Sequence, residues 1–273
     1  MHIAVCVKQV PNPDALAAVL RIDAAGRNAV LPPGHPLVVS PFDEQAMEAA
    51  LRLRDAAGGT GVRISVITLG PEPARAALKH CLALGADDAV HLLDPVFSDS
   101  DAAGIARALS AAIRALETVD LVLTGRQAAD LDAGAVGLGI AETLGCTAVS
   151  FACGIATTPT GIRVERVIPD GVEEVEANLP ALVTISNELG EPRKASLRET
   201  MKAARKPVVV RSAADLGLTV ADVGPAAVAV HRRRLFIQEK AGVCELIQGS
   251  DAAEQAARLL DRLLETRVLE LRQ

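Results

Sequence analysis

The residues with the clearest chemical potential follow a buried apolar run at positions 120–124. Gly125 and Arg126 come directly after this run, and a glycine-containing stretch begins at Gly134. Glycine lets a ligand approach the backbone closely, and arginine is suited to phosphate. A helix that begins near Gly134 would direct its free N–H groups into the same space. This spacing favours a nucleotide-binding site, and the alternative is an ordinary loop in which glycine only makes a turn.

Two acidic residues lie between these groups. Asp130 and Asp132 would repel a phosphate, because a carboxylate carries the same sign of charge. They suit a ribose hydroxyl or the cap of the following helix better. The stretch as a whole therefore favours a nucleoside with a phosphate over a bare phosphate.

The rest of the sequence carries no pattern typical of catalysis or metal binding. It has no G-x-G-x-x-G, no Walker phosphate loop, no nucleophile elbow and no H-E-x-x-H. The five histidines are far apart, and the five cysteines show no C-x-x-C spacing. We therefore expect no catalytic residues, no metal site and free thiols, which indicate a reducing compartment. Residues 1–8 are typical of a strand and not of a secretion signal, so a cytoplasmic location is expected.

Composition narrows the function classes further. The chain has 273 residues and a net charge of −6, and half of its residues are apolar. That apolar content excludes a disordered protein. The aromatic residues are four phenylalanines, whereas a binder of single-stranded nucleic acid needs stacking rings and a basic groove. The composition therefore favours a globular protein that does not bind nucleic acid.

The pattern of elements in the first half positions the candidate site. Apolar runs at 2–7, 63–69, 89–93 and 120–124 are typical of buried parallel strands. Helices are expected at 73–84, 101–116 and 134–144, and another begins at Pro41, where Ser40 can act as its cap. This alternation predicts an α/β fold with a doubly wound, mainly parallel sheet and helices on both faces. Ligands bind such sheets beyond the carboxyl ends of strands, and Gly125 falls there.

The spacing of apolar residues changes after residue 147, from alternating strand and helix signals to strand signals. Runs at 162–168 and 172–178 flank a Pro-Asp-Gly turn and predict a β-hairpin, and a further strand is expected at 179–185. The uncharged stretch 143–162 contains glycines and a proline, so it favours strand and turn over a membrane helix. Residues 208–230 have no clear period and are interpreted as an arm or linker. A final amphipathic helix is expected from one apolar face, made of Ala256, Leu259, Leu260, Leu263 and Leu264.

A basic segment lies at 187–207. It carries more cationic than acidic side chains, and a charge run of this kind is usually a solvated face. Its bulky apolar side chains are Leu189, Leu197 and Met201. They favour a second interpretation, in which they lie exposed as a contact patch.

Four stretches resemble the β subunit of electron transfer flavoprotein. They are residues 7–11 (VKQVP), 40–44 (SPFDE), 120–130 (DLVLTGRQAAD) and 179–203, which runs from LPALVT through EPR to MKA. The likeness covers nearly the whole chain and is strongest over 1–207. The last two stretches are the most specific, because their order and spacing both agree with the family.

The resemblance implies a heterodimer with an α subunit that holds a redox-active FAD. The β subunit of this family is a doubly wound chain that binds AMP in some branches and a second FAD in others. By position, the family's nucleotide site falls on Cys6, Ser40, Pro41, Phe42, Asp43, Leu69, Gly125, Arg126, Gln127, Ala128, Ala129, Asp130, Asp132, Gly134, Ala135 and Val136.

The loop after residue 125 favours FAD over AMP in this chain. It lacks the Asn-Gln-Thr run that is typical of the AMP branch, and it keeps the Val-Gly step of the flavin branch at Val136-Gly137. Gly134 and Ala135 replace larger side chains and leave room for a bulkier ligand. We therefore expect a second FAD in the β site, with AMP as the alternative.

The resemblance also divides the chain into two parts. Residues 1–207 are expected to form the nucleotide-binding domain. It includes a loop near 187–203, in which Leu197 docks onto flavoprotein dehydrogenases. Residues 208–273 are expected to form a C-terminal arm that packs on the α subunit.

The predicted function is that of an electron carrier subunit. It shuttles electrons between flavoprotein dehydrogenases and an acceptor, without a substrate reaction of its own. The first alternative is a stand-alone adenine-nucleotide-binding or sensing protein of the same fold, which would not need residues 179–203. The second is a nucleotide hydrolase, which the missing phosphate loop disfavours.

Overall fold

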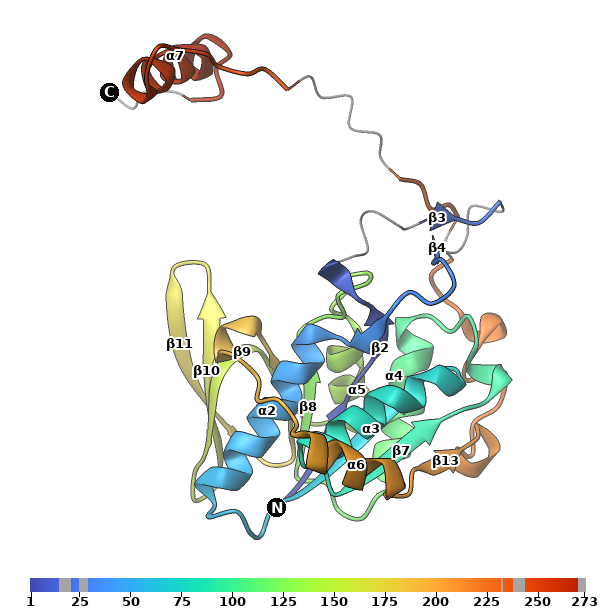
Figure 1. Ribbon diagram of the computed structural model, residues 1–273. Helices are drawn as coiled ribbons and strands as arrows, with labels where there is room; N and C mark the ends of the chain where they lie inside the picture. The colour runs from blue at the N-terminus through green and yellow to red at the C-terminus, as the bar shows by residue number, and fades with distance from the viewer. Residues whose placement is uncertain (15–20, 25–28, 232, 238–243, 270–273) are drawn as a thin grey trace. The chain divides into compact units, whose positions relative to one another are not determined.

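The computed structural model describes residues 1–14, 21–24, 29–231, 233–237 and 244–269 (Figure 1). The chain forms two compact units, Met1–Arg234 and Leu235–Gln273. The first unit contains the main sheet and all the candidate nucleotide-site residues. In its described part, the second unit contains the helix α7 (Ala252–Glu265), which the apolar face predicts.

A nine-stranded sheet forms the centre of the first unit, in the order β11-β10-β9-β12-β8-β1-β6-β7-β13. Neighbouring strands from β9 across to β13 are parallel, whereas β9, β10 and β11 pair antiparallel. The bounds are β1 (His2–Cys6), β6 (Arg63–Leu69), β7 (Asp88–Leu92), β8 (Leu121–Gly125), β9 (Thr147–Thr157), β10 (Gly161–Ile168), β11 (Gly171–Asn178), β12 (Ala181–Ile185) and β13 (Val209–Arg211). Two small antiparallel pairs lie outside this sheet: β2 (Gln9–Pro11) with β5 (Leu37–Val39), and β3 (Arg21–Ile22) with β4 (Ala29–Val30).

Helices cover both faces of the sheet, as the alternation predicts. The helices α2 (Pro41–Ala56) and α3 (Arg75–Leu84) pack on one face, in a core that includes Met47 and Leu78. The helices α4 (Ala102–Arg114) and α5 (Val136–Leu144) pack on the other, around Leu109 and Ile140. All residues of β1, β8 and β12 are buried, because strands covered on both faces have no solvent side. Short 3₁₀ helices complete the unit: η1 (Glu72–Ala74), η2 (Pro95–Phe97), η3 (Asn187–Leu189), η4 (Ala214–Leu216) and η5 (Pro225–Ala227).

The sheet reverses its direction of growth beside β1. The chain builds outward from β1 to β6 and β7, and then returns to place β8 on the other side of β1. The connection after β1 leads to α2 on one face, and the connection after β8 leads to α5 on the other. The carboxyl ends of β1 and β8 therefore open into the position where doubly wound sheets bind ligands.

The hairpin predicted from the Pro-Asp-Gly turn is confirmed. Strands β10 and β11 pair in register, with Ile168 opposite Gly171 at the turn. The uncharged stretch before it forms β9, whose pairing with β12 shifts near Phe151, a residue with a φ of 62°. No helix among the described residues is long and apolar enough to span a membrane.

Two segments differ from the sequence predictions. Leu197 does not lie in a loop, because it is the first residue of α6 (Leu197–Arg205). Ser196 caps that helix by accepting the Glu199 N–H at 3.2 Å.

Residues 208–230, expected as an arm or linker, contribute the edge strand β13 beside β7, and Val223 is completely buried. A strand of three residues is too short to give a readable period. The compact first unit therefore continues to Arg234. Within the expected arm, residues 232, 238–243 and 270–273 lie outside the described structure.

Candidate functional site

Asp43 joins three elements at the carboxyl edge of the sheet. It lies in the first turn of α2. Its carboxylate accepts the N–H of Lys8, just after β1, at 2.8 Å, and the N–H of Gly125, the last residue of β8, at 3.0 Å. The N–H of Ser40 donates in return to the Lys8 carbonyl at 2.9 Å. The carboxyl ends of β1 and β8 are thereby held against the amino end of α2.

Burial changes the acidity of two groups at this junction. It raises the pKa of Asp43 from its ordinary value of 3.8 to about 7, although the backbone donors Lys8 and Gly125 lower it. Burial, together with the nearby Asp43 carboxylate, raises the pKa of the Cys6 thiol to about 12. Cys6 therefore stays a neutral thiol at the end of β1 and has no nucleophilic character near neutral pH.

The space beside Gly125 is taken by α2. A Cβ at this position would lie 2.6 Å from Oδ1 of Asp43 and 2.7 Å from the backbone carbonyl carbon of Phe42. The missing side chain therefore serves the packing of α2 against β8, whereas the sequence suggests an approach path for a ligand. Close packing of this kind requires glycine for steric reasons alone.

Ser40 does not cap α2 with its side chain, in contrast to the sequence prediction. Pro41 stands at the first helical position and has no N–H to satisfy. The Ser40 hydroxyl instead accepts the N–H of Ala129 at 3.3 Å. The residue before α2 thus holds the loop after β8, and the structure brings positions 40–43 and 125–129 together.

Arg126 stacks between two phenylalanines. Its guanidinium carbon lies 5.0 Å from the ring centre of Phe42 and 5.8 Å from that of Phe151. One terminal nitrogen donates to the Ser186 hydroxyl at 3.0 Å. The buried Nε of Arg126 has no partner within the described structure. A buried donor in this state is the kind of group that a ligand oxygen satisfies.

Lys8 and Asp130 form an ion pair beside this arginine. The Lys8 Nζ lies 2.6 Å from Oδ2 of Asp130, and the other Asp130 oxygen is buried without a partner among the described residues. Asp132 accepts a hydrogen bond from the Gln127 side chain at 2.9 Å. Neither aspartate caps α5, so the capping interpretation of these acids is wrong. The unpaired Asp130 oxygen remains suited to accept from a hydroxyl.

The amino end of α5 is open to an anion. Its N-cap residue is Ala135, which provides no side-chain hydrogen bond, and its first turn contains no acidic residue. Gly134 precedes it with a φ of 61°, in the left-handed region that favours glycine. Unsatisfied N–H groups and the positive end of the helix dipole together favour a phosphate at such a position.

These features fit an adenine nucleotide. The uncapped end of α5 matches a phosphate, the unpaired Nε of Arg126 matches a ligand oxygen, and the unpaired Asp130 oxygen matches a ribose hydroxyl. The small residues Gly134 and Ala135 leave the backbone between them accessible.

The other candidate residues lie around this cluster or apart from it. Cys6 and Leu69 end neighbouring parallel strands at the same edge, and Leu69 is half-buried. Leu197 lies on α6, outside the cluster.

Three residues that contact this cluster were not among the candidates: Lys8, Phe151 and Ser186. Lys8 directly follows a predicted strand, and the rule that ligands bind beyond the carboxyl ends of parallel strands (the strand-end rule) could have found it. Phe151 lies in a stretch whose apolar residues have no clear spacing.

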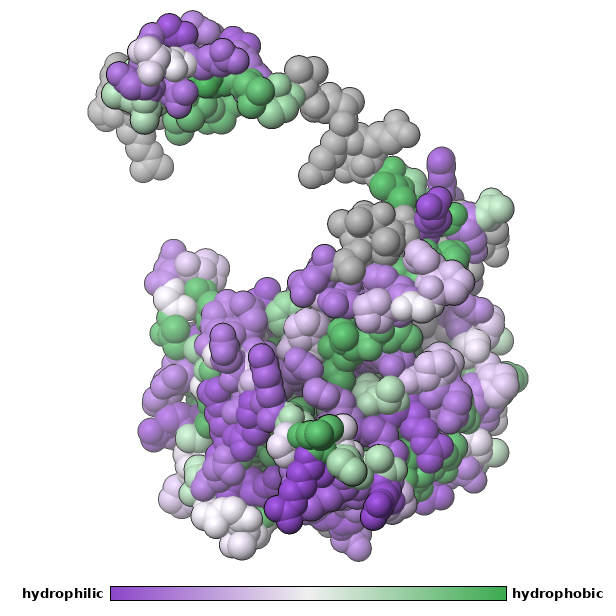
Figure 2. Space-filling view, viewed as in Figure 1, coloured by the Kyte–Doolittle hydropathy of each residue, from purple (hydrophilic) through white to green (hydrophobic). Residues whose placement is uncertain are grey.

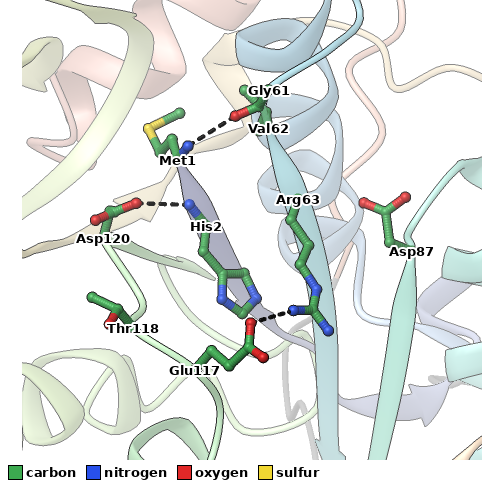
Figure 3. A pocket seen from close by; sticks show the side chains of 9 residues that line it. All are labelled: Met1, His2, Gly61, Val62, Arg63, Asp87, Glu117, Thr118 and Asp120. Atoms are coloured by element: carbon green, nitrogen blue, oxygen red, sulfur yellow. Dashed lines mark hydrogen bonds and ion pairs between the residues drawn. The ribbon is translucent and has the colours of Figure 1, made fainter.

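A separate hollow lies at the opposite edge of the sheet (Figure 3). It measures about 590 Å³, and its lining includes His2, Arg63, Glu117 and Asp120. These groups are paired: the backbone N–H of His2 donates to the Asp120 carboxylate at 2.7 Å, and the Arg63 side chain donates to Glu117 at 2.9 Å. The hollow contains none of the candidate residues and lies at the amino ends of β1 and β6, away from the ligand-binding edge of a doubly wound sheet.

Helix α6 presents apolar side chains to solvent. Leu197 is 78% exposed and Met201 is 62% exposed, whereas Leu189, grouped with them from the sequence, is buried. Figure 2 shows a small hydrophobic patch over α6, within a face that is mainly hydrophilic. Lys194 and Arg198 are exposed nearby in the sequence. An apolar spot with a basic rim is typical of a contact surface.

Comparison with known proteins gives the family of the chain. Residues 30–216 match the model of the electron transfer flavoprotein domain. The chain is 35% identical over 269 residues to the caffeyl-CoA reductase-Etf complex subunit CarD of Acetobacterium woodii, across 98% of this chain and 100% of that protein. It is 34% identical over 271 residues to the electron transfer flavoprotein subunit beta of Megasphaera elsdenii, across 97% of each chain. It is 38% identical over 225 residues to protein FixA of Azorhizobium caulinodans, across 80% of this chain and 77% of that protein.

These matches confirm the resemblance seen in the sequence, and they disfavour a stand-alone nucleotide-binding protein. They agree with the mainly parallel sheet and its helices on both faces. The chain belongs to the electron transfer flavoprotein family, as an electron-transfer subunit of its β type.

Proposed function

We propose that the chain works with a flavin-bearing α subunit and carries electrons between a flavoprotein dehydrogenase and an acceptor. The observation that carries this proposal is the uncapped amino end of α5 at the switch point of the sheet. The relative in Acetobacterium woodii is named as a subunit of a reductase–Etf complex, which supports a role within an assembly.

An adenine nucleotide would lie between the amino ends of α2 and α5. In this assignment, the backbone around Gly134, Ala135 and Val136 binds a phosphate, and Arg126 donates to a ligand oxygen. Asp130 accepts from the ribose. The remaining candidates would enclose the ligand and exclude water; they are Cys6, Ser40, Pro41, Phe42, Asp43, Leu69, Gly125, Gln127, Ala128, Ala129 and Asp132.

We assign FAD, rather than AMP, to this site. Gly134 and Ala135 are small, and the end of α5 behind them is uncapped, which leaves space and donors for a pyrophosphate. Phe42 and Phe151 flank Arg126 and offer flat apolar surface to a ring system. Bound FAD would supply the redox chemistry of the site. The chain's own residues bind the cofactor and orient it.

The patch on α6 is proposed to dock onto flavoprotein dehydrogenases. Leu197 is its anchor, because a large apolar side chain that is 78% exposed gains free energy when a partner's pocket covers it. The basic side chains beside it would favour a partner with acidic groups around that pocket.

The C-terminal part is proposed to pack on the α subunit. On α7, Leu259 and Leu260 remain 46% and 47% exposed. Covering such leucines is favourable by about 25 cal/mol per Å² of apolar area. A partner chain would supply that cover.

We further propose that the chain has no substrate reaction of its own and acts in the cytoplasm. The neutral Cys6 thiol at the site and the absence of a catalytic motif support the first statement. The second is supported by the five cysteines, all of which are free.

Purification from the native source tests the proposed function. A tagged chain should bring down a second subunit in a 1:1 ratio, and the flavin of that complex should bleach when a dehydrogenase and its substrate are added. A monodisperse monomer that carries a full flavin complement by itself would contradict the proposal.

A further inference from the structure

Helix α6 packs on the rest of the first unit with little burial of apolar side chains. Among its 9 residues, only Ala203 is buried. A helix of this length is marginal alone, because the cost of nucleation exceeds what a few hydrogen bonds return. Polar contacts with neighbouring elements must therefore fix its position.

Lys79 of α3 holds the carboxyl end of α6. Its Nζ donates to the carbonyl oxygens of Ala203 at 3.1 Å, Ala204 at 3.0 Å and Lys206 at 2.5 Å. A helix leaves its last carbonyls unsatisfied, and its dipole is negative at that end. A lysine from another helix thus caps α6 with both charge and hydrogen bonds.

Glu48 of α2 holds the segment that leads into α6. Its side chain is only 6% exposed. It accepts three hydrogen bonds from Arg193: from the backbone N–H at 3.1 Å, Nε at 2.8 Å and Nη2 at 3.2 Å. Arg52 donates to the same carboxylate at 2.9 Å and to the Leu189 carbonyl at 2.8 Å. A buried, multiply bonded ion pair of this kind is costly to break.

We propose that Lys79 and Glu48 are positioning residues for the docking surface of α6. Arg193 precedes Leu197 by four residues, and Ala203 follows Met201 by two, so the two tethers bracket the exposed apolar pair. They order this surface before a partner arrives, which removes an entropy cost from binding. The inference rests on the docking role proposed for Leu197, and it adds that residues of α2 and α3 set the geometry of that surface.

The test uses the intact heterodimer with the variants Lys79→Met, Lys79→Arg, Glu48→Gln and Leu197→Ala. Arg75→Met is the matched control, because Arg75 is a cation on the same helix whose ion pair is with Glu72 and not with α6. Two quantities are measured: backbone hydrogen exchange of residues 197–205, and kcat and KM with a dehydrogenase that reduces the wild-type heterodimer.

Lys79→Met should speed exchange in α6 at least tenfold and raise KM about fivefold with kcat unchanged, and Lys79→Arg should restore both. Glu48→Gln should act in the same direction. If Glu48→Gln does not fold, Lys79→Met decides alone, because Lys79 is partly exposed.

Unchanged exchange in α6 would overturn the proposal. So would an unchanged KM for Lys79→Met when Leu197→Ala raises the KM. Leu197→Ala should raise KM without changing exchange. If its KM stays at the wild-type value, the docking function itself fails, and with it the positioning role for docking.

Discussion

At the scale of single residues, the site is built from groups that each serve two partners. Asp43 accepts hydrogen bonds from Lys8 and Gly125. Ser40 donates its N–H to the Lys8 carbonyl and accepts the N–H of Ala129 with its hydroxyl. Arg126 stacks on Phe42 while donating to Ser186. A substitution in this cluster therefore affects packing as well as ligand binding. Variants have to be compared by both stability and nucleotide content.

Gly125→Ala should destabilise the fold. The added methyl would lie within 2.7 Å of Phe42 and Asp43, so α2 has to move away from β8. Overpacking of this kind costs about 1–3 kcal/mol, and the melting temperature should fall by about 5 °C. Gly104→Ala in α4 is the control. A Cβ added there would meet only side-chain atoms, of which the nearest is Cβ of Ser100 at 3.2 Å. A melting temperature for Gly125→Ala equal to that of the control would show that α2 does not pack as described.

Asp43 should make stability depend on pH. Its pKa rises from 3.8 to about 7 on folding, so the folded state holds the proton more tightly and unfolding releases it between these values. The free energy of unfolding should therefore fall as pH rises through this window and level off above it. Urea titrations from pH 4 to 8 should show this slope in the wild type and lose it in Asp43→Asn.

Asp43→Asn should also be less stable at low pH, because an amide offers one acceptor to the two backbone donors Lys8 and Gly125. The exposed Asp261→Asn is the control and should follow the wild-type profile. An Asp43→Asn profile with the wild-type slope would mean that another group causes the dependence.

Leu197→Ala should slow electron delivery while leaving the fold intact. Leu197 is 78% exposed, and surface substitutions change stability by about 0.5 kcal/mol or less, whereas loss of a docking anchor costs about 2 kcal/mol of binding. The rate of reduction by the dehydrogenase and the melting temperature are both measured. Val172→Ala, at an equally apolar residue that is 60% exposed on β11, should change neither. A large loss of thermal stability in Leu197→Ala would place this side chain in the core.

At the scale of elements, the spacing of apolar residues predicts the strands and helices that are buried. It does not predict those that are held mainly by polar contacts. The run at 63–69 matches β6 residue for residue, because all but its ends are buried between two helical layers. Helix α6 has one buried residue, so its sequence shows a charge run instead of an apolar stripe. The strand-end rule predicts a ligand site beside the loop after β8. It could not show that Gly125 serves α2 or that Ser40 binds Ala129, since both depend on distant segments.

The leucine face of α7 should be needed for assembly. Leu260→Asp puts a charge on the face of α7 on which Leu259 and Leu260 are about half exposed. It should weaken heterodimer formation at least tenfold, measured by analytical ultracentrifugation, because burying an unpaired charge is unfavourable. Asp261→Asn, outside the leucine stripe, should assemble as the wild type does. Unchanged assembly of Leu260→Asp would remove α7 from the interface.

At the scale of the whole molecule, the chain is an electron-transfer subunit whose described parts carry three separate features. The first unit contains the proposed nucleotide site at the switch point of its sheet and an exposed patch on α6, and the described part of the second contains a helix with exposed leucines. Each of these features has unpaired or exposed groups that the proposed cofactor or partner would cover. The membership of the electron transfer flavoprotein family supplies a reason for all of them.

The nucleotide content of the purified heterodimer tests the central claim most directly. The complex is denatured, and the released nucleotides are separated by chromatography and quantified against protein. We expect two FAD per heterodimer and no AMP. We expect one FAD to be lost in Arg126→Ala, which removes the donor, and likewise in Gly134→Val, which blocks the approach to α5. One FAD together with one AMP would contradict the assignment of FAD to this chain, and one FAD with no second nucleotide would contradict the site itself.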